Sequence, residues 1–191
     1  MRTRFETGSD SSDGASTESE SGDGDGDGDG DGDGDNLLTN PSFEELAGMT
    51  PTAWIADLTD AGQTVTSETD SPQDGERFVR LTLGGTPDSP SFGQLKQYLV
   101  VDAPSGSSFY GGVWVRCAST CDSLAVGMAL SVDDGMGGLT DVELGSTVAG
   151  PNWKFVEGVF DASSDVQSIS VQLNGANGTF DYDGAVLRRT N

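Results

Sequence analysis

The chain has 191 residues, and its 9 Lys and Arg face 32 Asp and Glu, which gives a formal net charge of -23 at pH 7. We expect neither nucleic acid nor an anionic membrane as a partner, because phosphate binding requires clustered Lys and Arg. The sequence contains no histidine, which removes the usual general base, the usual zinc ligand and every Ser-His or Cys-His nucleophile. Only carboxylates remain for acid–base catalysis, and no glycosidase-like pair stands out among them, so we expect that the protein is not an enzyme.

The first 35 residues predict a disordered acidic tether rich in Ser, Asp and Gly. Almost no apolar side chain occurs in them, and from Asp23 to Asp35 they alternate strictly between Asp and Gly. Such a segment buries too little apolar surface to offset the entropy lost on ordering, and repeated like charges extend it. We therefore divide the chain into a tether, residues 1–35, and a folded domain, residues 36–191.

The domain opens with Asn-Leu-Leu-Thr-Asn-Pro-Ser-Phe-Glu over residues 36–44. A pair of leucines, a turn at Asn40-Pro41 and an apolar anchor at Phe43 predict a short first strand. Glu44 follows the anchor directly. Its carboxylate is therefore placed to close a metal site with a second acid far along the chain.

Beyond this opening, apolar residues recur with a period of two, which predicts half-buried strands. The segments with this pattern are 76–83, 95–101, 109–117, 124–132, 153–160, 168–173 and 179–187. Clusters of Gly, Pro, Asp, Asn and Ser separate them, for example at 174–178, and no window of useful length has a helical period. About eight to ten short strands at this spacing indicate an all-β, antiparallel β-sandwich of the jelly-roll type.

Two cysteines, Cys117 and Cys121, enclose a short loop between two predicted strands. Reactive redox pairs are usually Cys-x-x-Cys, and a zinc site would need two further ligands. We predict a disulfide across this connection, which implies an oxidising compartment, and two free thiols are the alternative. Because the loop is short, the disulfide would add only about 2 kcal/mol of stability.

The segment 109–117 carries the main candidates for ligand binding. Tyr110, Trp114 and Arg116 share the face opposite its aliphatic residues, and an aromatic pair with an arginine suits a saccharide. The alternative is a packing strand in which Arg116 pairs with an acid. Tyr98 and Gln172 point outward by the same parity and complete the candidate set. The small residues at alternate positions of 125–131 would leave room for a groove beside Trp114.

Several landmarks together resemble the CenC-type carbohydrate-binding modules, which belong to the galactose-binding-like jelly rolls. The landmarks, in chain order, are residues 36–44, Trp54, and the segments 74–81, 95–101, 109–116, 153–160 and 180–187. The resemblance covers essentially all of residues 36–191. It implies a jelly roll that binds a polysaccharide or oligosaccharide without catalysis, in which Trp54 and Trp153 are buried packing residues.

The same resemblance implies a structural Ca²⁺ that ties the first strand to the last. The matching positions are Glu44 and Asp183, with Asp74 as a third contributor, and carboxylate oxygens are suitable ligands for this ion. The family usually has two adjacent acids near the end of the domain, whereas Gly184 follows Asp183 here. The alternative is that these residues are acids at strand ends with no bound ion.

Taken together, these features predict a monomeric binding module displayed outside the cell or at its surface on a lipoprotein-like tether. No stretch is long and apolar enough to span a membrane, and no apolar signal core follows the first residues. We therefore expect no direct membrane insertion, and the extracellular placement rests on the tether, the cysteines and the resemblance. The alternative is a structural or adhesion β-sandwich that binds a cell-surface protein instead of a glycan.

Overall fold

The computed structural model describes residues 35–86, 88–119, 121 and 125–191. All the regular elements in these ranges are β-strands, which confirms the predicted all-β class. The strands are β1 (Leu46–Ala47), β2 (Thr50–Pro51), β3 (Ile55–Leu58), β4 (Thr64–Glu68), β5 (Phe78–Leu83), β6 (Gly85–Thr86), β7 (Ser89–Pro90), β8 (Phe92–Ala103), β9 (Ser108–Cys117), β10 (Ala125–Asp133), β11 (Leu139–Val148), β12 (Lys154–Asp161), β13 (Val166–Ala176) and β14 (Gly178–Arg189). The predicted tether, residues 1–35, lies outside the described residues except for Asp35.

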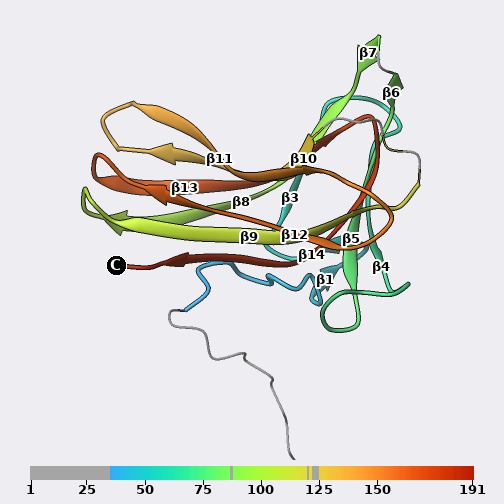
Figure 1. The fold of residues 1–191 in the computed structure, drawn as a ribbon, viewed down its shortest axis with the longest axis horizontal. Helices are drawn as coiled ribbons and strands as arrows, with labels where there is room; N and C mark the ends of the chain where they lie inside the picture. The colour runs from blue at the N-terminus through green and yellow to red at the C-terminus, as the bar shows by residue number, and fades with distance from the viewer. Residues whose placement is uncertain (1–34, 87, 120, 122–124) are drawn as a thin grey trace, which may run out of the picture. The chain divides into compact units, whose positions relative to one another are not determined.

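Two five-stranded antiparallel sheets pack against each other in a sandwich (Figure 1). Sheet I has the strand order β11-β10-β13-β8-β3, and sheet II has the order β12-β9-β14-β5-β4. The remaining described strands form two short hairpins, β1–β2 and β6–β7, and the second hairpin projects from the sandwich (Figure 1). This architecture is the antiparallel β-sandwich that the alternating pattern predicts.

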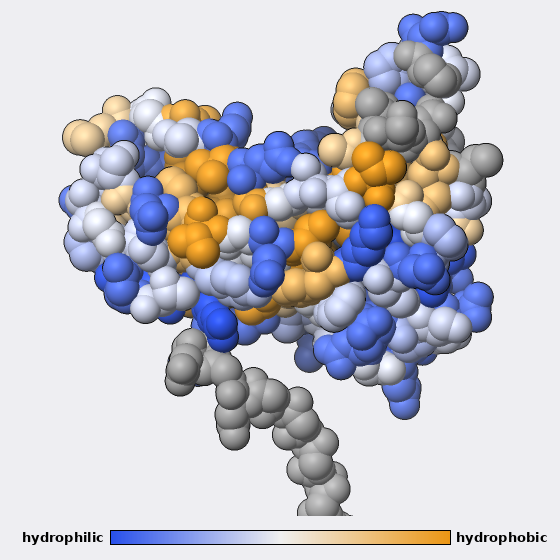
Figure 2. Space-filling view, viewed as in Figure 1, coloured by the Kyte–Doolittle hydropathy of each residue, from blue (hydrophilic) through white to orange (hydrophobic). Residues whose placement is uncertain are grey.

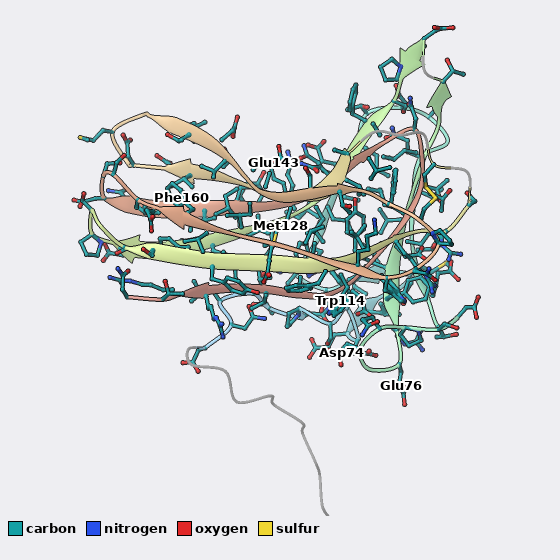
Figure 3. All side chains as sticks on the ribbon, in the orientation of Figure 1. Asp74, Glu76, Trp114, Met128, Glu143 and Phe160 are labelled. Atoms are coloured by element: carbon teal, nitrogen blue, oxygen red, sulfur yellow. A yellow bond between two sulfur atoms is a disulfide. The ribbon has the colours of Figure 1, made fainter. Side chains whose placement is uncertain are left out.

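The core lies between the two sheets because each strand turns its apolar face inward. On β9, Phe109, Val113 and Val115 are fully buried, while Tyr110 and Trp114 point to the outer face of sheet II. Strand β10 contributes the facing layer from sheet I, and its Met128 lies between the sheets in Figure 3. The alternation predicted for these two segments is therefore confirmed.

The opening segment differs from its prediction, because residues 36–43 form no regular strand. Asn40 and Phe43 have positive φ angles of 50° and 62°, which no β-strand accommodates. The segment is nevertheless bound to the end of β14, where the N–H of Leu37 donates to the carbonyl of Leu187 at 2.7 Å. The first and last parts of the domain are thus joined by backbone hydrogen bonds.

The two tryptophans expected to pack have different environments. Trp54 is 4% exposed, and its ring lies 5.2 Å from that of Phe43, which confirms a core position. Trp153 is only half-buried and packs edge-on against Phe78 on the outer face of sheet II. The prediction of a core position is therefore wrong for Trp153, which lies at the start of an edge strand where only one side is covered.

Strands β11 and β12 bring the two sheets together at one edge of the sandwich. A Cβ atom on Gly158 would collide with the carbonyl oxygen of Leu144, and one on Gly145 would lie 2.8 Å from the carbonyl oxygen of Glu157. Backbones approach this closely only where glycine removes the side chain. The two glycines therefore allow the edge to close.

The predicted disulfide is present. Cys117, at the end of β9, is bonded to Cys121, and their Cα atoms are 6.0 Å apart. In the described part of the chain, no helix has the length and apolar character needed to cross a bilayer.

Candidate functional site

A pocket of about 390 Å³ opens on the outer face of sheet I. Strands β3, β8, β10 and β13 contribute to it. The lining residues are Asp57, Thr59, Phe92, Gly93, Gln94, Ala125, Asn174, Gly175 and Ala176. Its size falls in the range of small-molecule sites, which is roughly 300–1,000 Å³.

Three planar polar side chains form a row across the pocket. Strand register places Asp57 opposite Gln94 and Gln94 opposite Asn174, so their side chains share the outer face of the sheet. The carboxylate of Asp57 accepts a hydrogen bond from Lys96 Nζ at 2.5 Å and one from Gln94 Nε2 at 3.3 Å. The side-chain amide of Asn174 makes no hydrogen bond within the described protein, and it is therefore available to a ligand.

The charge of Asp57 is fixed by its neighbours. The hydrogen bond from Lys96, and then the positive charge of its ammonium group, lower the pKa of this carboxyl below its usual value. Asp57 is therefore ionised at neutral pH, and it can accept but not donate hydrogen bonds.

One aromatic ring stands at the rim of the pocket. The side chain of Phe92 is 58% exposed, and it projects from the same face of β8 as Gln94 two residues later. An exposed aromatic face beside planar hydrogen-bonding groups is the combination that stacks on and orients a small polar ligand with an apolar side.

The five residues predicted to bind sugar are not brought together. Tyr98 and Gln172 lie on the outer face of sheet I, outside the pocket lining, and Tyr98 is 64% exposed. Tyr110, Trp114 and Arg116 lie on the outer face of sheet II, across the sandwich. The small residues at alternate positions of 125–131 belong to sheet I, so Ala125 lines the pocket and none of them lies beside Trp114.

Arg116 has the packing role that the sequence left open. Its Nε donates to Asp181 Oδ2 at 2.8 Å, and its two terminal nitrogens donate to backbone carbonyls of residues 70–71. The guanidinium also lies over the rings of Trp153 and Phe78, at 4.4 and 4.9 Å from their centroids. Because its donors are used inside the domain, Arg116 has little left to offer a ligand.

Asp181 is the centre of this cluster. It is completely buried, and it also accepts two hydrogen bonds from Arg80, at 2.7 and 3.0 Å. A buried carboxylate with two arginine partners is a structural charge cluster, since removing the carboxylate would deprive both guanidinium groups of this counter-charge.

The two aromatic candidates on sheet II are each packed against a neighbour. The hydroxyl of Tyr110 donates to Glu157, and Arg188 lies over its ring at 4.8 Å from the centroid. Burial, followed by the carboxylate of Glu157, raises the pKa of Tyr110 to about 12. Trp114 is half-buried against Phe155, with ring centroids 5.2 Å apart. A role for these two rings in sugar binding stays a prediction.

The three predicted metal ligands lie around one loop. Glu44 Oε1 accepts hydrogen bonds from the N–H groups of residues 76–77 at 2.7 and 3.0 Å. Asp183 Oδ2 accepts them from residues 73–74 at 2.7 and 2.9 Å. Asp74 is the third acid, and Figure 3 shows it near Trp114. Its backbone N–H is one of the two that donate to Asp183, which lies on β14. The two anchoring carboxylates therefore bind the loop directly through its backbone.

The donor type fits Ca²⁺, because this ion prefers carboxylate oxygens and three acids from distant segments lie around the loop. However, no group of three acidic or cysteine side chains among the described residues is arranged to hold a metal ion. Burial, opposed by the backbone N–H groups of residues 73, 74 and 184 and reinforced by the carboxylate of Asp74, raises the pKa of Asp183 to about 6. Structural calcium stays a prediction, and the hydrogen bonds already account for how the loop is held.

The residues that line the pocket were missed in the sequence for identifiable reasons. The alternation in the sequence predicts a strand from residue 95, whereas β8 starts at Phe92, and Phe92 and Gln94 both point outward. Asn174 was placed in a turn cluster, but β13 continues through it to Ala176. Asp57 lies in a four-residue edge strand that is too short to show a period.

No family model matches the chain, and no curated protein matches it. Solved structures do. The sandwich is similar to the CBM22-1 xylan-binding domain of Paenibacillus barcinonensis Xyn10C, with a TM-score of 0.60 and 15% identity, over 82% of this chain and 95% of that domain. It is also similar to TmCBM61 in complex with β-1,4-galactotriose, with a TM-score of 0.53 and 21% identity, over 82% of this chain and 99% of that one.

The first match is the enzymatically active domain of tailspike protein 4 of bacteriophage CBA120, with a TM-score of 0.64, 15% identity and coverage of 81% of this chain. This chain spans only 21% of that protein. At these identities the likenesses establish the fold alone, which is the jelly roll shared by carbohydrate-binding modules. Membership of the CenC-type group specifically stays a resemblance.

Proposed function

We propose that this protein is a non-catalytic module that binds an uncharged polysaccharide or oligosaccharide in the pocket on sheet I. The observation that carries this proposal is the exposed ring of Phe92 beside the polar row of Asp57, Gln94 and Asn174. The structural neighbours named for xylan and galactotriose support it, because this sandwich matches each of them over most of both chains.

Each group has a definite role in this proposal. Phe92 would cover the apolar face of a sugar ring, and the unpaired amide of Asn174 would donate to one hydroxyl and accept from another. The carboxylate of Asp57, already oriented by Lys96, would accept from a hydroxyl. Charge-assisted hydrogen bonds of this kind are the stronger ones in a binding site.

The charges on the outer face of sheet I favour an uncharged ligand. Asp133, Asp141 and Glu143 lie on the same outer face of sheet I as Asp57. Lys96 is the cation next to the pocket, and it is already paired with Asp57. An acidic polysaccharide would meet like charges here, which weakens its binding relative to a neutral one.

The pocket also argues against hydrolysis. Asp57 is the one acidic side chain among the described residues that line it, whereas glycosidases use two carboxyl groups. Because the pKa of Asp57 is lowered, this group would not act as a general acid near neutral pH.

Retention on immobilised xylan and β-1,4-galactan tests the proposal. We expect that Phe92→Ala and Asn174→Ala each weaken retention at least tenfold, because they remove the stacking surface and the free amide. Val100→Ala is the matched control, since Val100 is an exposed residue on the same face of β8, away from the pocket. Retention of Phe92→Ala equal to that of the wild type would reject this site.

A structural or adhesion module that binds a protein is the second candidate. Figure 2 shows apolar residues gathered in the middle of the visible face, with hydrophilic residues around them. Among the described residues, Val100 and Leu139 are exposed apolar side chains on the outer face of sheet I, whereas Val159 is exposed on that of sheet II. Exposed apolar side chains that gather on one face favour a protein partner. No signal on a glycan array, together with capture of a defined cell-surface protein, would favour this candidate.

We also propose that the domain is monomeric and acts outside the cell or at its surface, on the acidic tether. The disulfide between Cys117 and Cys121 supports an oxidising compartment. Immunolabelling of intact cells expressing the full chain would test the placement, and labelling only after permeabilisation would contradict it.

A further inference from the structure

The backbone at Phe92 is held by hydrogen bonds from two side chains. Its carbonyl oxygen accepts a hydrogen bond from Thr59 Oγ1 at 2.9 Å and another from Gln63 Nε2 at 3.0 Å. Gln63 is itself buried, and its Oε1 accepts from the N–H groups of residues 59–60. One side chain therefore joins the loop before β4 to the first residue of β8.

Ser91, the residue before Phe92, has all its polar groups paired. Its N–H donates to Asn177 Oδ1 at 2.8 Å, and its carbonyl accepts from the N–H of Asn177 at 3.1 Å. Its hydroxyl donates to Asp60 Oδ2 at 2.5 Å and accepts from Gln63 Nε2 at 2.6 Å. Ser91 is thus fixed from two sides, by the 59–63 loop and by the turn between β13 and β14.

Asn177 completes the network from that turn. It is 4% exposed, its Nδ2 donates to the carbonyl of Thr86 at 3.1 Å, and its φ is 49°. A Cβ atom on Gly85 would collide with Asn177 Oδ1 and lie 2.7 Å from the nitrogen of Ser91, so glycine is required there. The side-chain amide of Asn177 therefore connects the β6–β7 hairpin, the turn between β13 and β14, and the residue before β8.

The location of these groups is informative because buried polar groups destabilise a fold unless they are paired. Gln63, Ser91 and Asn177 are three of the seven buried polar or charged residues in the described chain, and their hydrogen bonds converge on the backbone that carries one exposed ring. A ring that only contacted solvent would need no such support. A ring that receives a ligand gains from it, because a rigid platform has less entropy to lose on binding.

We propose that Asn177, Ser91 and Gln63 are positioning residues that hold Phe92 in its binding orientation. The inference rests on the proposed function, since it gives the network a role in glycan affinity. It assigns no ligand contact to the three residues. They act through the backbone of residues 91–92, and Phe92 is the residue through which they affect the sugar.

Asn177→Gly tests the proposal, because glycine tolerates the positive φ and lacks the side-chain amide. We expect titration calorimetry with xylohexaose and β-1,4-galactotriose to show at least tenfold weaker binding for the glycan that binds the wild type. We also expect ¹⁵N relaxation of the free protein to show lower order parameters at residues 91–93, from about 0.85 to below about 0.6, with the other strands unchanged. Asn152→Gly, which replaces an exposed loop asparagine, is the matched control.

The outcomes separate this inference from the proposed function. If Phe92→Ala abolishes binding while Asn177→Gly keeps full affinity and full order, the positioning role is overturned and the site stands. If Phe92→Ala binds like the wild type, the proposed site fails, and the order parameters then decide whether the network holds the backbone of Phe92. If Asn177→Gly does not fold, Ser91→Ala gives the same readings, because it removes the two hydrogen bonds that the Ser91 hydroxyl makes with Asp60 and Gln63 in the same network.

Discussion

Glu44 and Asp183 each hold the loop of residues 73–77 through two backbone N–H groups. A Cβ atom on Gly75 would collide with the carboxylate of Glu44, so the loop backbone approaches this side chain as closely as glycine allows. The two carboxylates therefore hold the loop in place by hydrogen bonds, whether or not an ion binds to them. The carboxylate of Asp74 repels that of Asp183, and a divalent cation bound between them would relieve this repulsion.

Calcium binding at this loop would appear in thermal melting. At a Ca²⁺ concentration of about 100 times Kd, an ion bound only to the folded state adds about 2.7 kcal/mol, which corresponds to a Tm increase of roughly 5–10 °C for a domain of this size. We expect a chelator to remove this increase and Asp74→Asn to abolish it, while Asp88→Asn, in the exposed β6–β7 hairpin, leaves it intact. A Tm that is insensitive to chelator and to added Ca²⁺ would reject the ion.

The burial and direction of single side chains were predictable from the sequence where a nearby motif or the alternation within one strand determines them. The outward direction of Tyr110 and Trp114 follows from strand alternation, and the core position of Trp54 follows from its place in the resemblance. The sequence did not identify the partner of Arg116, because Asp181 is 65 residues away and is brought next to it by the pairing of β9 with β14. Side-chain roles that depend on long-range pairing are not encoded in a local period.

At the scale of elements, the strands with two neighbours in the five-stranded sheets were predictable, whereas of the four edge strands only β12 was. β5, β8, β9, β10, β13 and β14 lie inside their sheets, and an alternating segment predicts each of them. β3, β4 and β11 lie at sheet edges, where solvent contact weakens the alternation between apolar and polar faces. The candidate pocket was missed for the same reason, since one of its walls is the edge strand β3.

The contact between the edge strands β11 and β12 gives a stability prediction. Gly158→Ala would drive a Cβ atom into the backbone of Leu144, and we expect it to lower the free energy of unfolding by about 1–3 kcal/mol, measured by chemical denaturation. Gly150→Ala is the matched control, because a Cβ atom there meets nothing within 4 Å. Equal stability of the two variants would show that the sheets do not need this close approach.

For the whole molecule, the decisive question is which face of the sandwich receives the ligand. Sheet II has its outer aromatic rings and arginines engaged with one another, in the cluster of Asp181 and in the pairing of Trp114 with Phe155. Sheet I has a pocket, a free amide and an exposed ring held by a buried network. The sequence could predict two faces with outward polar and aromatic residues, but not which strands share a face.

Chemical-shift mapping of the ¹⁵N-labelled domain during titration with xylohexaose or β-1,4-galactotriose tests the central claim most directly. We predict saturable shifts of the backbone amides of Gln94 and Gly175 and of the side-chain amide of Asn174, all at the pocket on sheet I. Shifts confined to Tyr110, Trp114 and their neighbours on sheet II would contradict this claim and place the ligand on the opposite face.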